Sequence, residues 1–191
     1  MIGFIRTLLS CPVAVFSGIA VISVFALGAA LYSEVALGLE PCILCIYQRV
    51  PFVIGAVLGI IGLMLRQKPR AVNVVLGALG VNFLVNSGIA FYHTGVEQKW
   101  WASAVEGCSV PDFGAMAAAG EPASTQSMLE NIMSAPTGNC AEIPWQDPIF
   151  GLSMANYNVL LCLGVFAVCT LSIIVRKQFG SSCVVDGMKC D

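Results

Sequence analysis

The sequence predicts an all-α membrane protein, a bundle of four transmembrane helices with one long loop between the third and fourth helices. Of its 191 residues, 58% are hydrophobic and only 10% are charged, and the mean hydropathy is +0.86. This balance lies far from that of a soluble globular domain. Four apolar stretches approach the roughly 20 residues that a helix needs to cross a bilayer. We therefore expect residues 1–191 to form a single membrane domain.

The four expected spans cover residues 13–32, 43–65, 71–92 and 152–175. Polar or helix-breaking residues interrupt the middle two: Arg49, Pro51, Asn73, Asn82 and Asn86. Because such groups need partners inside lipid, these two spans should pack against neighbouring helices. The first stretch could instead be a secretory signal, since Arg6 precedes it. Its apolar run is long for a signal, however, and its removal would leave an odd number of spans.

Positive charge gathers on one side of the spans. The flanking basic residues are Arg6, Arg66, Lys68, Arg70, Arg176 and Lys177, whereas the opposite segments are mainly acidic. Positive residues near spans are retained in the cytoplasm. We therefore expect both termini, the tail 176–191 and the loop 66–70 to be cytoplasmic, and the loops 33–42 and 93–151 to lie outside. The net charge of -2 and the lack of a basic patch argue against a nucleic-acid partner.

The long outer loop is acidic and rich in Ala, Gly, Ser and Pro, which favours an exposed segment over a packed domain. Ser127 and Glu130 have capping-box spacing, and an apolar stripe follows the helical period over residues 128–133. A short helix lying parallel to the membrane fits this pattern, and so does an irregular turn. Trp100, Trp101 and Trp145 are typical of side chains that anchor span ends at the interface.

The nine cysteines divide by predicted location. Three lie on the cytoplasmic side, where thiols stay reduced: Cys11, Cys183 and Cys190. Two lie inside the last span and are expected to serve packing: Cys162 and Cys169. Four lie on the outer side: Cys42, Cys45, Cys108 and Cys140. An even number of cysteines in an oxidising compartment favours disulfide pairing.

Cys42 and Cys45 form a C-x-x-C motif at the outer start of the second span. Two thiols so placed can close a small disulfide, and the positive end of the helix dipole favours the reactive thiolate. Arg49 follows one turn later and should face a thiolate or an electron-accepting headgroup, because a cation is costly in lipid. A purely structural disulfide remains an alternative. A closed zinc site needs four ligands, and His93 stands outside any ligand cluster in the sequence, so we expect no metal.

The ten residues from Glu40 to Arg49 closely resemble the signature of the disulfide bond formation protein B (DsbB) family. Three further segments are similar to the long outer loop of that family: 92–97, 140–145 and 151–154. The resemblance thus covers nearly the whole chain. The spacing of Cys108 and Cys140 and the Ala-rich stretch between them differ from the best-known member, and this affects the surface that would meet a partner.

This resemblance implies a quinone-dependent thiol oxidase of the bacterial inner membrane. It implies that a periplasmic thioredoxin-fold thiol oxidase (DsbA-like) gives electrons to Cys108 and Cys140. These would pass to Cys42 and Cys45 and then to ubiquinone or menaquinone in the lipid bilayer. Arg49 would lie near the quinone, and Cys45 would be the thiolate that faces it. A system of this kind keeps the bacterial periplasm oxidising.

His93 and Glu97 are four residues apart and would share a helix face if the third span continued outward. We expect them beside the quinone as a proton route, with a polar pair at the water boundary as the alternative. Two other functions compete with disulfide generation. One is a membrane conduit that carries electrons outward to reduce periplasmic thiols, and the other is a noncatalytic scaffold held by two disulfides.

Overall fold

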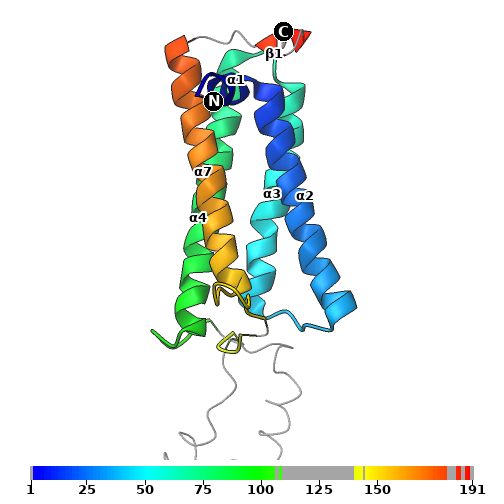
Figure 1. Ribbon diagram of the computed structural model, residues 1–191, viewed down its shortest axis with the longest axis vertical. Helices are drawn as coiled ribbons and strands as arrows, with labels where there is room; N and C mark the ends of the chain where they lie inside the picture. Colours follow the sequence, from blue (N-terminus) through cyan, green and yellow to red (C-terminus); the bar gives the residue numbers. More distant parts are fainter. Residues whose placement is uncertain are drawn as a thin grey trace, which may run out of the picture.

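Four long helices stand side by side in a bundle (Figure 1). This computed structural model describes residues 2–105, 108, 140–143, 145–179, 184–185 and 188–189. The bundle helices are α2 (Pro12–Leu37), α3 (Ile43–Met64), α4 (Pro69–Glu97) and α7 (Met154–Phe179). Each is long and apolar enough to cross a membrane. The predicted four-span fold is therefore confirmed.

Short elements lie at the end of the bundle that holds both termini (Figure 1). Helix α1 (Ile2–Ser10) was not predicted, and a small hairpin pairs β1 (Val184–Val185) with β2 (Met188–Lys189). Two hydrogen bonds from α7 hold the end of α1: Ser172 Oγ donates to the Leu9 carbonyl at 2.7 Å, and Arg176 donates to the Ser10 carbonyl at 3.0 Å. We call this end of the bundle the terminal end and the opposite end the loop end.

Two helices extend further at the loop end than the sequence predicted. Helix α2 continues past Tyr32 to Leu37, so Glu34 is helical and not part of the 33–42 loop. Gly38 then ends it in the left-handed region with φ 63°, which glycine adopts without steric cost. Helix α4 continues past Tyr92 to Glu97 because its last turn is buried. The helix expected near 128–133 lies outside the described residues, as do Cys183 and Cys190.

Close packing joins the helices in the order α2, α3, α4, α7, whereas α2 and α7 make few contacts with each other. Glycines on α3 let α2 approach: a Cβ at Gly62 would lie 2.5 Å from the buried Phe16 ring. Asn82, one of the polar residues of the middle spans, finds a partner on the neighbouring helix, as expected. Asn82 of α4 donates to the Pro51 carbonyl of α3 at 2.8 Å. Cys169 is fully buried in the apolar core, which confirms its predicted packing role.

Candidate functional site

A cavity of about 690 Å³ opens at the loop end of the bundle. Its walls are mainly apolar and come from α2, α3, α4, α7, the 38–42 connection and the segment before α7 that holds Glu142, Ile143 and Trp145. The polar or sulfur-bearing side chains that line it include Cys42, Cys45, Gln48, Arg49, His93 and Glu97. A mainly apolar cavity of this volume with a few convergent polar groups is typical of a small-molecule site.

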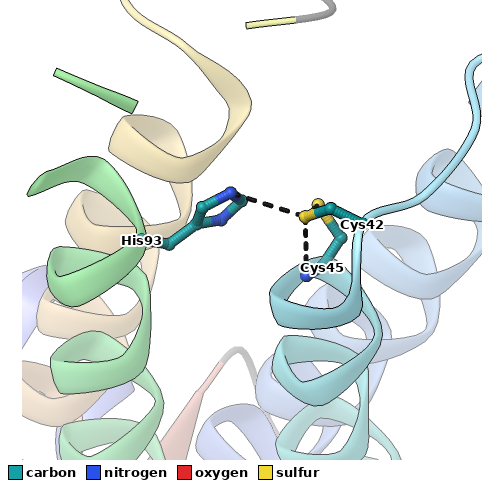
Figure 2. A group of neighbouring side chains, drawn as sticks. All are labelled: Cys42, Cys45 and His93. Atoms are coloured by element: carbon teal, nitrogen blue, oxygen red, sulfur yellow. Dashed lines mark hydrogen bonds between the residues drawn. The ribbon is translucent and has the colours of Figure 1, made fainter. Parts of the chain in front are cut away.

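Cys42 and Cys45 lie at the first turn of α3, as the sequence predicted. Cys42 is the N-cap residue, and its sulfur accepts a hydrogen bond from the Cys45 backbone N–H at 3.2 Å (Figure 2). The two sulfur atoms are 2.7 Å apart. Since a disulfide bond measures about 2.0 Å, a small movement closes the pair. The N-terminal end of α3 also favours negative charge on Cys42.

The surroundings of Cys42 favour its thiolate. A hydrogen bond from the Cys45 thiol, assisted by a hydrogen bond with His93, lowers the pKa of Cys42 to about 4 from an ordinary value of 9.0. Burial opposes this shift by penalising the charged form, but the hydrogen bonds outweigh it. The reduced pair therefore carries its thiolate at Cys42 at neutral pH, whereas the family resemblance implied Cys45. A thiolate is the form that attacks disulfides.

His93 is brought into contact with this pair, and here our sequence analysis was wrong. We placed His93 outside any ligand cluster, yet its Nε2 lies 3.5 Å from the Cys42 sulfur (Figure 2). The ligand atoms of Cys42, Cys45 and His93 all lie within 4.8 Å of one another. The reason is that α4 stays helical beyond Tyr92 and its last turns lie beside the start of α3.

Glu97 lies one turn after His93, on the same face of α4. Its Oε1 is 3.7 Å from His93 Nε2, and Ser153 Oγ donates to its Oε2 at 2.5 Å. His93 is only 3% exposed and Glu97 only 6%. Both side chains of the pair are therefore buried inside the protein.

Arg49 forms an ion pair with Glu34 of α2. Both side chains line the cavity and are about one-quarter exposed, at 23% each. We expected Arg49 to face a thiolate or a headgroup, and we did not anticipate this partner. The sequence placed Glu34 in a loop, so the extension of α2 by one turn is what makes the ion pair possible.

Cys108 and Cys140 form a disulfide bond. The pair is buried, with exposures of 1% and 0%, in one apolar cluster with Cys42, Leu44 and Val96. The structure thus brings the two cysteine pairs together, although the loop pair was expected to be carried on an exposed tether. Thiol–disulfide exchange requires such proximity, because one sulfur must attack another directly.

Sequence reasoning missed three polar residues that complete the site. Gln48 contacts the His93 ring, Asn158 contacts Gln48, and Ser153 contacts Glu97. Gln48 and Asn158 are polar residues within otherwise apolar spans. That departure from the apolar pattern is the signal that could have found them.

The comparison with known proteins agrees with this geometry. Residues 13–172 match the family model described as disulfide bond formation protein DsbB. The chain belongs to the DsbB family. It is 34% identical to disulfide bond formation protein B of Shewanella sp. (strain MR-4), over 81% of this chain and 82% of that one. It is 29% identical to the protein of the same name from Dechloromonas aromatica (strain RCB), over 84% of this chain and 90% of that one.

DsbB membership confirms the resemblance found in the sequence and defines the general activity. Together with four apolar helices, it makes the chain a multi-pass membrane oxidoreductase that supports disulfide bond formation. The DsbB family is generally quinone-linked and implies a partnership with a periplasmic thiol oxidase.

Proposed function

We propose that this chain oxidises a periplasmic thioredoxin-fold thiol oxidase (DsbA-like) and passes the electrons to a membrane quinone. The route runs from Cys108 and Cys140 to Cys42 and Cys45 and then to the quinone. The observation that carries the proposal is that Cys42 lies both in one buried cluster with the Cys108–Cys140 disulfide and on the wall of the cavity. One sulfur pair thus connects the other pair to a small-molecule site.

The exchange steps balance without any further reactant. A thiolate of the partner attacks the Cys108–Cys140 bond and forms a mixed disulfide, which the second partner thiol resolves, leaving both loop cysteines reduced. A loop thiolate then attacks the Cys42–Cys45 disulfide in the same way, so the loop pair is reoxidised and Cys42 and Cys45 become reduced. In sum, the partner loses two electrons and two protons, and a quinone takes them up as a quinol.

The cavity residues fit a quinone headgroup. Bound there, a quinone would supply a two-electron, two-proton acceptor. Arg49 would place a permanent positive charge on the cavity wall, while His93 and Glu97 would hold protons close to the cysteine sulfurs. Cys45, one turn before Arg49, would face the headgroup. Residues of α2 and α7 line the cavity, and these two helices make few contacts with each other. An opening between them would suit a lipid-soluble quinone, either ubiquinone or menaquinone.

We place the chain in the bacterial inner membrane with the loop end facing the periplasm. The support is the distribution of charge, because basic residues near cytoplasmic ends of spans are typical of membrane proteins. Arg66 and Lys68 lie in the connection between α3 and α4, Arg70 lies in the first turn of α4, and Arg176 and Lys177 lie in the last turn of α7. These helix ends are at the terminal end of the bundle (Figure 1). With this orientation both cysteine pairs lie on the periplasmic side. The outward electron conduit is disfavoured, because Cys162 and Cys169 are fully buried and do not form a disulfide.

The proposal is tested with the purified full-length chain, a reduced thioredoxin-fold thiol oxidase and short-chain ubiquinone. We expect oxidation of the partner and loss of quinone absorbance. Cys42→Ser and Cys45→Ser should each abolish both, because either change removes the pair that reduces the quinone. The matched control Cys169→Ser, a buried cysteine that does not line the cavity, should retain both. Undiminished quinone reduction by the Cys42 or Cys45 variant would refute the route.

A further inference from the structure

A continuous row of buried and partly buried polar groups leads from the middle of the bundle to Cys42. Asn86 Nδ2 donates to Cys162 Sγ at 3.2 Å, and the Cys162 thiol donates to Asn158 Oδ1 at 3.2 Å. Asn158 Nδ2 donates to Gln48 Oε1 at 2.5 Å. The Gln48 amide nitrogen lies 2.9 Å from His93 Nδ1. The row crosses α4, α7 and α3 and ends where His93 Nε2 meets the Cys42 sulfur at 3.5 Å.

The order of donors along this row determines the protonation of the histidine ring. Gln48 Oε1 is occupied as the acceptor of the Asn158 amide, so the Gln48 amide nitrogen faces His93 and can only donate. Nδ1 must then accept, and it carries no proton. In the neutral ring the single proton therefore sits on Nε2. That is the nitrogen that faces Cys42.

We propose that Gln48 and Asn158 are positioning residues that hold His93 in the Nε2–H tautomer, with its N–H aimed at the Cys42 sulfur. A thiolate accepts a hydrogen bond, so this tautomer favours the charged form of Cys42. The opposite tautomer would present a lone pair to the same sulfur and would favour the thiol. Gln48 and Asn158 make their hydrogen bonds with each other, with His93 and with Cys162. Through the histidine ring, these two amide side chains set which form of Cys42 is stabilised.

The free-energy cost of breaking a buried hydrogen bond explains why the row would keep one order of donors and acceptors. Gln48 is buried and Asn158 partly buried, so an unpaired amide group there would lose a hydrogen bond that water does not replace. Within a low-dielectric interior, a row of hydrogen bonds is worth more than its separate members. This inference deepens the proposed function and rests on it for the role of Cys42. The tautomer itself can be measured without quinone or partner, so the two ideas can fail separately.

The chain contains a single histidine, which makes a direct experiment possible. We would label the full-length reduced protein with ring-¹⁵N-histidine and record the two nitrogen shifts at about pH 8, where an ordinary imidazole is neutral. Protonated and unprotonated ring nitrogens have well-separated shifts. We expect Nδ1 to be unprotonated and Nε2 to be protonated. A proton on Nδ1, in the other tautomer or in a doubly protonated ring, would overturn the proposal.

Two variants test whether the amides are responsible. Gln48→Met and Asn158→Leu keep side-chain volume but remove the hydrogen bonds, and each should give a mixture of tautomers. Asn82→Leu is the matched control, since Asn82 also donates a hydrogen bond from α4 to α3 but lies outside the row. It should keep the single tautomer. A single Nε2–H tautomer in both amide variants would show that other contacts fix the ring, and would equally overturn the assignment.

Discussion

Nε2 of His93 lies 3.5 Å from Sγ of Cys42, although 51 residues separate them along the chain. The contact joins the last turns of α4 to the residue that caps α3. It gives the Cys42 sulfur a further hydrogen-bond partner in addition to the thiol and the backbone N–H of Cys45. The chemical consequence is a thiolate buried against the cavity at neutral pH, and this can be measured.

The pH dependence of Cys42 alkylation should reveal that thiolate. Its pKa is lowered to about 4, so between pH 4 and the ordinary value of 9.0 the residue should be anionic where a free cysteine is protonated. We expect a nearly constant alkylation rate from about pH 6 to 9 and a fall as the pH drops toward 4. The measurement is the rate of iodoacetamide labelling of the Cys42 peptide, followed by mass spectrometry.

The titratable groups that face Cys42 determine which variants serve as controls for the alkylation profile. They are Cys45 on α3 and His93 and Glu97 on α4. Cys45→Ala removes the largest cause of the lowered pKa, so its alkylation midpoint should move upward. A midpoint near 9 in the unaltered protein would mean that the hydrogen bonds do not stabilise the thiolate.

Arg49 and Glu34 form an ion pair, so their substitutions separate a binding role from a structural one. Arg49→Gln should raise the quinone KM about tenfold to a hundredfold, the value of one charge-assisted hydrogen bond. Glu34→Gln removes the ion pair but keeps the cation, and should change KM by less than about fivefold. Both disulfides should still form. Equal effects of the two substitutions on KM would assign Arg49 a structural role only.

Because Cys42, Cys108 and Cys140 share one buried cluster, a disulfide between the two pairs should be trappable. In the double variant Cys45→Ser, Cys108→Ser, the remaining Cys42 and Cys140 should pair on mild oxidation. Non-reducing peptide mapping would detect the bond, with buried Cys169 expected to remain a thiol in the same sample. If Cys42 and Cys140 both stayed reduced, direct exchange between the pairs would lose its support.

Much of the fold follows from simple physical rules. Bilayer thickness fixes the length of an apolar helix, which is why the four spans could be predicted from composition alone. The position of Cys42 and Cys45 at a helix start followed from the same reasoning. The end of α2 was harder to predict. Glu34 suggested a loop, but the residue that ends the helix is Gly38, and glycine is suited to that position.

The side-chain partners within the site could not be predicted in the same way. Gln48, His93 and Asn158 lie on three different helices, and their contacts depend on how the helices are rotated about their axes. Hydropathy fixes the length of a span but only weakly its rotation. The burial of Cys108 and Cys140 depends on tertiary packing for the same reason, since a loop of acidic and small residues has no periodic pattern to indicate it.

The packing of α2 on α3 gives a test of stability. A Cβ at Gly62 would lie 2.5 Å from the fully buried Phe16 ring, so Gly62→Ala should destabilise the protein by about 1–3 kcal/mol. Gly77→Ala on α4 is the control, because no heavy atom lies within 4 Å of its added methyl group. Thermal unfolding in detergent should show a lower Tm for the first and an unchanged or higher Tm for the second. An unaltered Tm for Gly62→Ala would contradict this packing.

The most direct test of quinone-coupled disulfide formation is a count of products in the absence of oxygen. The full-length chain would be mixed with a reduced thioredoxin-fold thiol oxidase and excess ubiquinone, and quinol and partner disulfide would both be quantified. We predict one quinol for each disulfide formed. Disulfide appearing in the partner without an equal amount of quinol would contradict the proposed transfer of electrons through Cys42 and Cys45.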